Sequence, residues 1–350
     1  MSARVCSTIA ALMAVAGCRN GAAPEPVPAR SRAPDPTAGP LVARSIALPG
    51  AGNEVFLDYI VYDRGRRRLW VPAGGSGAVD VIDAATDALT PVAGFATAEV
   101  ERRGRKRTVG PSAATVGDGV VYVGDRADST VCAIDATTLE RGGCAVLPSM
   151  PDGVAYVAAR KEVWVTAPGD RSLIVVDVSA PRAPRVAGAM KVDGEPEGYA
   201  VDGERFFTNL EDRNRTLVID TASRAVVKTW SPGCGEDGPR GLAYAADVRL
   251  LLVACTDHIV VLDAGGEQVG RLDTGAGVDN LDYVAGIRRA YAAAGGAGRL
   301  VVAELAPDGR LTQRAAVATA EGARNVVATE TGKAYVIDPR HGGVLVVAPR

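Results

Sequence analysis

The chain has 350 residues, of which 41 are Gly and 21 are Pro, and only 5% are aromatic, a composition that favours many short strands over long helices. Charged residues make up 23% and hydrophobic residues 47%, which excludes a disordered chain and a multi-pass membrane protein. Basic and acidic residues nearly balance, 39 against 41, so no overall charge points to nucleic acid or an anionic membrane surface as the partner.

The first seventeen residues have the pattern of an export signal. Arg4 precedes the apolar run 9–15, which is too short to span a bilayer because a span takes about 20 residues. Residues 15–18 (Val-Ala-Gly-Cys) resemble the lipobox of bacterial lipoproteins. That resemblance implies cleavage before Cys18 and a lipid on Cys18 that anchors the protein in the bacterial cell envelope, on the periplasmic or the surface side. An ordinary secretory signal cut elsewhere is the alternative.

Residues 18–41 are rich in Gly, Ala, Pro and Arg and show no apolar alternation. Such a segment cannot bury enough surface to offset the entropy of ordering it. We therefore expect a disordered tether between the anchor and a folded domain that spans 42–350.

A strand that ends in an acidic residue recurs along this domain. Its copies are separated by 52, 42, 43 and 43 residues, and they end at Asp83, Asp135, Asp177, Asp220 and Asp263. Related strands at 300–304 and 344–347 continue the series, and each unit has a pair of strands upstream. A period of about 40–45 residues is typical of propeller blades. The sequence therefore predicts one all-β domain, a seven-bladed β-propeller, instead of two or three domains.

Two copies of the second strand carry a family resemblance. Residues 121–125 (Val-Tyr-Val-Gly-Asp) and 206–209 (Phe-Phe-Thr-Asn), each followed by a strand that ends Ile-Asp, resemble the YVTN-type β-propeller repeat. The resemblance covers 42–350 and implies the fold. It leaves the activity open, because propellers of this kind include binding proteins, surface proteins and, more distantly, lactonases and cofactor-dependent dehydrogenases.

The seventh unit ends with its third strand, which would leave an open sheet edge. Residues 43–48, directly before the first complete unit, have the alternation of a strand. We therefore predict that this N-terminal strand completes the C-terminal blade and closes the ring.

Two charged features have structural interpretations. Each recurring aspartate precedes a turn, where its carboxylate would accept backbone N–H groups. The run 101–107 (Glu-Arg-Arg-Gly-Arg-Lys-Arg) lies between the first and second units and is interpreted as a solvated hairpin insertion. A loop that binds a partner or a polyanion on the channel-mouth face is the alternative. Nucleic acid is not expected, because no aromatic residues interleave with the charges.

Besides Cys6 in the signal and Cys18, the sequence has four cysteines, and none of their spacings is typical of structural zinc or c-type haem. An even number in an exported protein predicts disulfides. Cys132 and Cys144 fall on neighbouring strands of the second unit, whereas Cys234 and Cys255 fall on the same face of the fifth. We therefore predict the pairs Cys132–Cys144 and Cys234–Cys255.

Loops that enter the inner strands of a propeller gather around one mouth of its central channel, where a ligand site is expected. Aligning the units places a polar set there: Asp58, Ser112, Asp152, Glu197, Arg240, Asp279, Asn280, Arg324 and Asn325. Its arginines would suit a small anionic or zwitterionic ligand, and its carboxylate and amide oxygens would suit Ca²⁺ or another divalent cation. Charges that neutralise one another across a wet channel are the alternative.

No GxSxG elbow and no GxGxxG after a strand occurs, and we expect the two histidines, His258 and His341, to be exposed loop residues. The leading hypothesis is therefore a monomeric, envelope-anchored binding or interaction module without catalysis and without a required cofactor. Its partner would be an envelope protein or a small ligand.

The alternative function is a metal-dependent lactonase at the channel mouth. In that class of propellers, carboxylate and amide side chains near the axis hold a divalent cation that polarises the lactone. The likeness implies Glu197, Asn280 and Asn325 as ligands, together with one of Asp58, Asp152 or Asp279.

Overall fold

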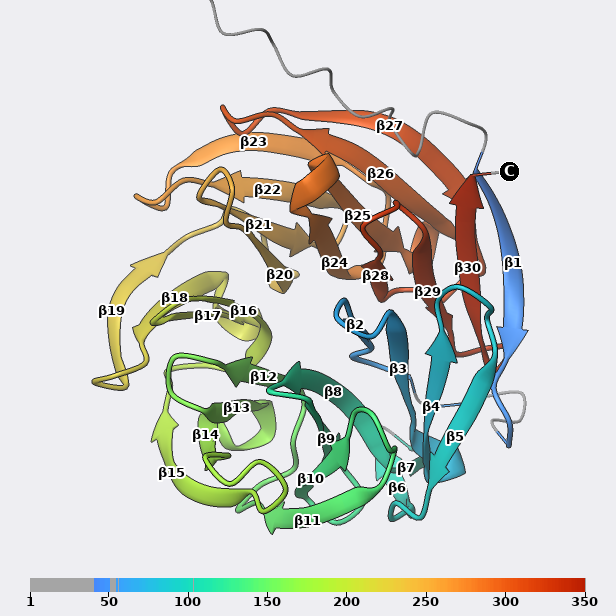
Figure 1. Cartoon of the computed structure of the whole chain (residues 1–350). Helices are drawn as coiled ribbons and strands as arrows, with labels where there is room; N and C mark the ends of the chain where they lie inside the picture. The colour runs from blue at the N-terminus through green and yellow to red at the C-terminus, as the bar shows by residue number, and fades with distance from the viewer. Residues whose placement is uncertain (1–40, 51–54, 56, 103, 350) are drawn as a thin grey trace, which may run out of the picture. The chain divides into compact units, whose positions relative to one another are not determined.

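The computed structural model describes residues 41–50, 55, 57–102 and 104–349. The predicted signal peptide, Cys18 and residues 18–40 of the predicted tether lie outside the described residues. Seven four-stranded antiparallel sheets stand around a central channel as the blades of a propeller (Figure 1), which confirms the predicted fold class. In the part of the chain that the structure describes, no helix is long and apolar enough to cross a membrane.

Each blade has an inner strand, two middle strands and an outer strand. The inner strands are β2 (Val61–Asp63), β8 (Pro111–Gly117), β12 (Val154–Val157), β16 (Pro196–Asp202), β20 (Pro239–Ala245), β24 (Val278–Val284) and β28 (Val326–Ala328). The second strands are β3 (Arg68–Ala73), β9 (Val120–Asp125), β13 (Glu162–Ala167), β17 (Arg205–Leu210), β21 (Leu250–Cys255), β25 (Arg289–Ala294) and β29 (Ala334–Asp338).

The third and outer strands complete the blades. The third strands are β4 (Ala78–Asp83), β10 (Thr130–Asp135), β14 (Ser172–Asp177), β18 (Arg215–Asp220), β22 (His258–Leu262), β26 (Arg299–Leu305) and β30 (Gly343–Pro349). The outer strands are β5 (Leu89–Ala93), β11 (Arg141–Val146), β15 (Arg185–Lys191), β19 (Ala225–Trp230), β23 (Gln268–Asp273), β27 (Leu311–Ala318) and β1 (Leu41–Ala47). Short 3₁₀ turns follow five strands: η1 (Gly74–Ser76), η2 (Pro168–Asp170), η3 (Glu211–Arg213), η4 (Ala285–Ile287) and η5 (Gly295–Ala297).

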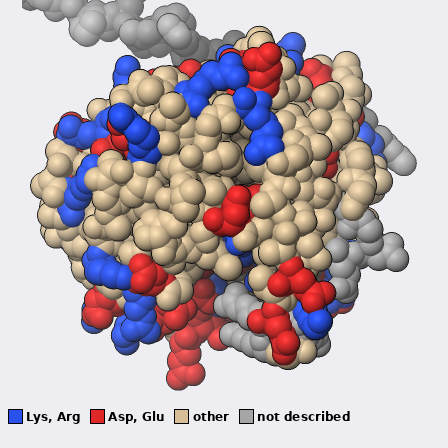
Figure 2. Space-filling view, turned by 90° about the horizontal axis from the view of Figure 1, so that it is seen from below, with Lys and Arg blue, Asp and Glu red and all other residues tan. Residues whose placement is uncertain are grey.

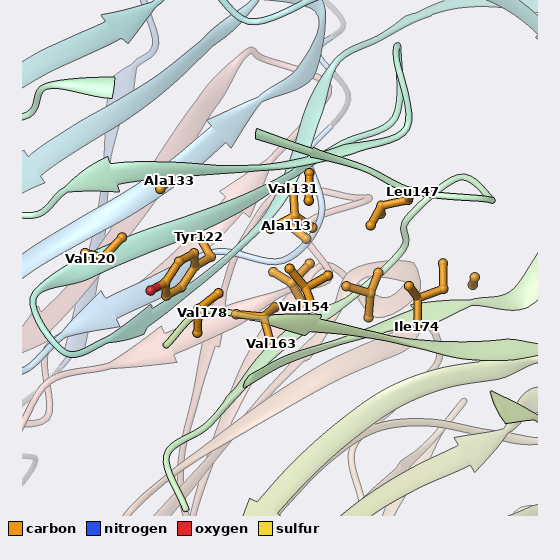
Figure 3. Close-up of a cluster of buried hydrophobic side chains, with 14 of the residues drawn as sticks. Ala113, Val120, Tyr122, Val131, Ala133, Leu147, Val154, Val163, Ile174 and Val178 are labelled. Carbon is orange, nitrogen blue, oxygen red and sulfur yellow. The ribbon is translucent and has the colours of Figure 1, made fainter. Parts of the chain in front are cut away.

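The core lies between neighbouring blades, which explains why the middle strands read as continuous apolar runs. Strand β10 is buried along almost its whole length because one face packs on the blade before it and the other on the blade after it. Figure 3 shows such a cluster, in which Tyr122 and Val131 of one blade meet Val154 and Val163 of the next. Outer strands such as β19 are mostly exposed and carry polar residues.

The first strand closes the ring, as predicted from the sequence. Strand β1 pairs antiparallel with β30 over its full length, from Leu41 opposite Pro349 to Ala47 opposite Gly343. The blade that contains the C-terminal strands is thereby completed by the N-terminal strand, and the ring has no unpaired seam.

The predicted disulfides are both present, Cys132–Cys144 and Cys234–Cys255. The run 101–107 belongs to a two-stranded hairpin inserted between the first two blades, β6 (Ala98–Arg102) and β7 (Arg105–Val109), as the sequence interpretation expected.

One expectation about the histidines is wrong. His258 is buried at the start of β22, where its Nδ1 contacts Asp257, whereas His341 is exposed as expected. The reason is that β22 is a middle strand with a neighbouring blade on each side, so even its first residue lies under that packing.

Candidate functional site

The predicted mouth residues lie where the inner strands begin, and several occupy irregular backbone. The pairing of β16 with β17 shifts register between Pro196 and Tyr199, and similar shifts occur at the starts of β8, β20 and β24. A bulge of this kind releases residues from the ladder and re-aims their side chains. Glu197, Arg240 and Asp279 all sit within such shifts. The mouth is therefore built from local breaks in otherwise regular blades.

Glycine allows the inner strands to approach one another at this level. A Cβ on Gly198 would lie 2.4 Å from the backbone oxygen of Arg240 and 2.4 Å from Cα of Gly241, both on the next blade. A Cβ on Gly241 would in turn lie 2.2 Å from Oδ1 of Asn280. The same Cβ would lie 2.7 Å from Cα of Asn280. Backbone atoms cannot move aside as a flexible side chain would, so these contacts require glycine at both positions.

A buried arginine joins two of the predicted carboxylates. Arg126 donates from one guanidinium nitrogen to Asp58, at 2.9 Å, and to Asp152. All three residues are less than a tenth exposed. Asn325 is also buried, and its Nδ2 donates to the other oxygen of Asp58 at 3.3 Å. One cation thus serves two carboxylates in a desolvated setting.

The other predicted arginines are also engaged. Arg324 pairs with Asp279 at 3.2 Å, and Arg240 pairs with Glu211 of η3. Asn280 serves the backbone, because its Oδ1 accepts the N–H of Leu281 at 2.8 Å. The two arginines that the sequence predicted to bind an anionic ligand are therefore already paired with carboxylates.

Glu197 differs from the other mouth carboxylates, because no cation is paired with it among the described residues. Burial raises its pKa well above the ordinary value, and the charges of Asp152, Asp279 and Asp58 raise it further. Burial likewise raises the pKa of Asp58 to about 7, against the lowering effect of Arg126. The mouth thus holds more carboxyl groups than its arginines pair with, and a bound cation would lower their pKa values and favour their ionised forms.

Tyr59 lies close to these carboxylates: burial raises the pKa of its hydroxyl, and their charges raise it further. Tyr59 belongs to the first blade and Tyr199 to the fourth, yet their ring centroids lie 5.5 Å apart. The backbone N–H of Tyr59 donates to the carbonyl of Ser112 at 3.0 Å, which fixes the residue against the second blade. The two rings therefore bring together residues of blades that are not neighbours in the ring.

Beside the mouth lies a pocket of about 380 Å³, here called the hairpin pocket. The inserted hairpin forms one wall and the loops entering blades three and four form the others. Its lining includes Val100, Arg107, Met150, Pro151, Asp152 and Glu195. Because Arg126 and Asp152 also line it, the pocket is continuous with the buried network of the mouth.

Some buried polar atoms at the mouth have no hydrogen-bond partner among the described residues. Oδ1 of Asn325 and Oγ of Ser112 are both buried and unpaired in the described residues. Buried polar atoms are usually satisfied, so unpaired ones in a cleft indicate where water or a ligand would bind.

The predicted metal ligands were tested against this geometry. Among the described residues, no group of three or more His, Cys, Asp or Glu side chains is placed to hold a metal ion. Asn280 is committed to its own strand, and Asn325 uses its amide nitrogen on Asp58. The divalent cation at Glu197, Asn280 and Asn325 stays a prediction.

Sequence reasoning from the loops that enter inner strands brought Asp58, Asp152, Glu197 and Asp279 to one place, but it missed Arg126. That arginine follows a second strand, β9, whose end reaches the same mouth. The pair Asp125-Arg126 at a strand end was the available signal.

Surface charge does not mark another site on the edge of the ring. Figure 2 shows acidic and basic side chains mixed along the rims of this edge, with a mostly uncharged surface between them and one acidic group near the centre of the view. A patch of one sign would have indicated a charged partner there.

No family model matches the sequence, and no curated protein matches it. Solved structures do. Virginiamycin B lyase from Staphylococcus aureus is 12% identical with a TM-score of 0.68, over 88% of this chain and 99% of that one. A chain of Kuenenia stuttgartiensis hydrazine synthase is 16% identical with a TM-score of 0.68, over 86% and 98%. A chain of a mitotic checkpoint complex is 15% identical with a TM-score of 0.70, over 97% and 99%. A lyase and an interaction protein at similar distance show a common fold, and this chain is a seven-bladed β-propeller.

Proposed function

We propose that this protein is a binding module of the bacterial cell envelope, a YVTN-type propeller held by a lipid on Cys18, which captures a cationic ligand at the channel mouth. The observation that carries the proposal is that the mouth has more buried carboxyl groups than arginine partners for them. Arg126 and Arg324 are both paired with aspartates, whereas Glu197 forms no ion pair among the described residues. An ammonium or guanidinium group would stabilise the ionised form of Glu197 and replace the hydration that its carboxyl group loses on burial.

The unpaired atoms agree with this ligand class. Oδ1 of Asn325 is a buried acceptor that lacks a donor, and an ammonium or guanidinium group offers several N–H donors. The adjoining hairpin pocket adds the apolar walls of Val100, Met150 and Pro151. The ligand would therefore be a small molecule or chain end with a positive group beside an apolar one, such as a basic peptide.

Calorimetry with two dipeptide amides tests the ligand class. N-acetyl-Leu-Arg amide is expected to bind at least about tenfold more tightly than N-acetyl-Leu-Gln amide, which carries no charge, a difference of about 1.4 kcal/mol. Glu197→Gln is expected to abolish that preference. Glu204→Gln is the matched control, since Glu204 is an exposed glutamate paired with Arg160 on the opposite face. Equal binding of the two amides, or no binding of either, would contradict the proposal.

The anchor requires its own experiment. In cells that express the full precursor, Cys18→Ala is expected to release the protein from the membrane fraction and to prevent incorporation of labelled fatty acid. Cys6→Ala, within the predicted signal, is expected to change neither. Labelling that persists in Cys18→Ala would refute the lipid anchor.

The alternative, a metal-dependent lactonase, has no observation in its favour among the described residues. Its prediction is stoichiometric divalent metal in protein purified without chelator, lost in Glu197→Gln together with turnover of lactones. The binding-module proposal predicts that neither is found.

A further inference from the structure

The opposite end of the channel holds a second pocket, of about 260 Å³. It is lined by inner strands of blades two to six, and its polar and aromatic residues are Thr115, Tyr156, Tyr199, Tyr244, Asp282 and Tyr283. Along β16, Tyr199 lies between Glu197 of the mouth and Val201 of this pocket, here called the tyrosine pocket. Its lining shares no residue with the hairpin pocket or with the charged network of the mouth.

The tyrosines are held in place by neighbouring blades. The hydroxyl of Tyr283 donates to Asp247 at 3.2 Å, and Tyr156 stacks on Tyr122 with centroids 6.2 Å apart. Tyr199 is fixed by its contact with Tyr59. The aromatic walls are therefore set before any ligand arrives, which lowers the entropy lost on binding.

Asp282 is the carboxylate of this pocket. Its two oxygens accept the N–H of Ala328, at 2.7 Å, and of Tyr283, at 2.8 Å, which orients it and still leaves lone pairs on both oxygens. Burial raises its pKa. Arg64, whose charge acts on it, forms its ion pair with Glu330 instead, at 3.2 Å. Among the described residues, then, no cation pairs with Asp282.

The lining decides between kinds of cation. A hard cation such as Ca²⁺ takes six to eight oxygen ligands, whereas this pocket offers one carboxylate, the hydroxyl of Thr115, which already accepts the N–H of Tyr156 at 3.1 Å, and tyrosine hydroxyls. Of these hydroxyls, that of Tyr283 is bound to Asp247 and that of Tyr244 to Arg205. Aromatic rings around a carboxylate suit an organic ammonium ion, which is attracted by ring faces and carries its own apolar surface. We propose that the tyrosine pocket binds a small methylated or quaternary ammonium ion, with Asp282 as its counter-ion.

This inference is independent of the mouth proposal, and one strand supplies variants that separate them. Asp279 and Asp282 both lie on β24, the first paired with Arg324 at the mouth and the second in the tyrosine pocket. Asp282→Asn retains an acceptor for a backbone N–H but removes the charge. Asp279→Asn removes a charge of the same kind at the other site.

Calorimetry with choline and with 3,3-dimethylbutan-1-ol, its uncharged isostere, tests the inference. Choline is expected to bind at least tenfold more tightly than the alcohol, about 1.4 kcal/mol, and Asp282→Asn is expected to remove that preference. Asp279→Asn should leave choline binding unchanged. Tyr156→Phe should retain it and Tyr156→Leu should weaken it several-fold, and melting curves establish that each variant is folded.

Three results would overturn the inference. They are equal binding of choline and the alcohol, no binding of either by folded wild-type protein, and an unchanged choline affinity in folded Asp282→Asn. Loss in Asp279→Asn but not in Asp282→Asn would place the ammonium at the mouth instead, and would support the first proposal while refuting this one.

Discussion

Carboxylates occur on both faces of the ring in opposite environments. On the mouth face, where inner strands begin, burial raises the pKa of Asp58 and of Glu197. On the opposite face, where third strands end, exposed aspartates accept backbone N–H groups from the next turn. Asp135, for example, accepts two such bonds at 2.9 Å, and they lower its pKa. These turn bonds confirm the structural role that the sequence pattern predicted for the recurring aspartates.

The difference separates residues that serve the fold from residues that cost it stability. A carboxylate whose pKa is lowered stabilises the folded state when ionised, and one whose pKa is raised destabilises it when ionised. Carboxyl groups whose pKa is strongly shifted by burial lower the stability of the fold when they are ionised. Such groups are concentrated at functional sites. The contrast therefore favours the channel, at the mouth carboxylates and at Asp282, over the exposed turns as the place where this protein acts.

The largest expected effect comes from removing the cation of the mouth. Arg126→Met leaves Asp58 and Asp152 buried without that partner, which is expected to cost about 3–5 kcal/mol of unfolding free energy near neutral pH. The loss should shrink at about pH 5, because the carboxyl groups then take up protons. Denaturant melts at both pH values measure it.

Arg185→Met is the control, since Arg185 pairs with Asp177 in a largely exposed position on the other face. Surface pairs contribute little, so its melt should match the wild type. A loss in Arg126→Met no greater than in this control would remove the distinction between the two faces.

A smaller effect is expected from the backbone of the mouth. Gly198→Ala forces a Cβ against the backbone of the next blade and is expected to cost about 1–3 kcal/mol. Gly286→Ala, in η4 beyond the end of β24, meets nothing within 4 Å and should leave the melting temperature unchanged. Equal melting temperatures for the two variants would show that close packing at the mouth is not required.

The smallest effect is one of pH. Because the pKa of Glu197 is raised, the folded state holds its proton where the unfolded state does not. Its contribution to stability is fully present below the ordinary value of 4.5 and is lost as the pH rises through the raised pKa. Glu197→Gln is therefore expected to melt a few degrees above wild type at about pH 8 and equally at about pH 4.

Asp263→Asn on the opposite face should show the reverse dependence. Backbone N–H groups of Glu267 and Gly265 lower the pKa of Asp263, so its contribution is present above the ordinary value of 3.8 and is lost as the pH falls through the lowered pKa. The variant should be destabilised near neutral pH and not in strong acid. The same pH dependence in both variants would show that the two faces do not differ.

The fold was readable from the sequence because it repeats. The same strand-turn pattern occurs in every blade, so the recurring aspartates, the closing strand and both cysteine pairs could be placed from one alignment of units. The buried position of His258 could not, since a strand end and an exposed loop look alike in a single sequence.

The site was less readable for the opposite reason. Its residues depart from the repeat, as the bulge at Glu197 does, and their partners come from other blades. Arg126 and Asp58 lie 68 residues apart and come from neighbouring blades. Tyr59 and Tyr199 meet although their blades are not neighbours in the ring, which no repeat alignment of adjacent units would indicate.

The pairing of Leu41 with Pro349 also sets the order of folding. Strand β1 can pair only after β30, at the other end of the chain, has formed. Nearly the whole chain therefore lies in the loop that this pairing closes. Loop-closure entropy grows with length, and contacts of such large separation form slowly. We expect the seam to be the last step of folding, with a late kinetic phase that is abolished in a circular permutant in which β1 follows β30.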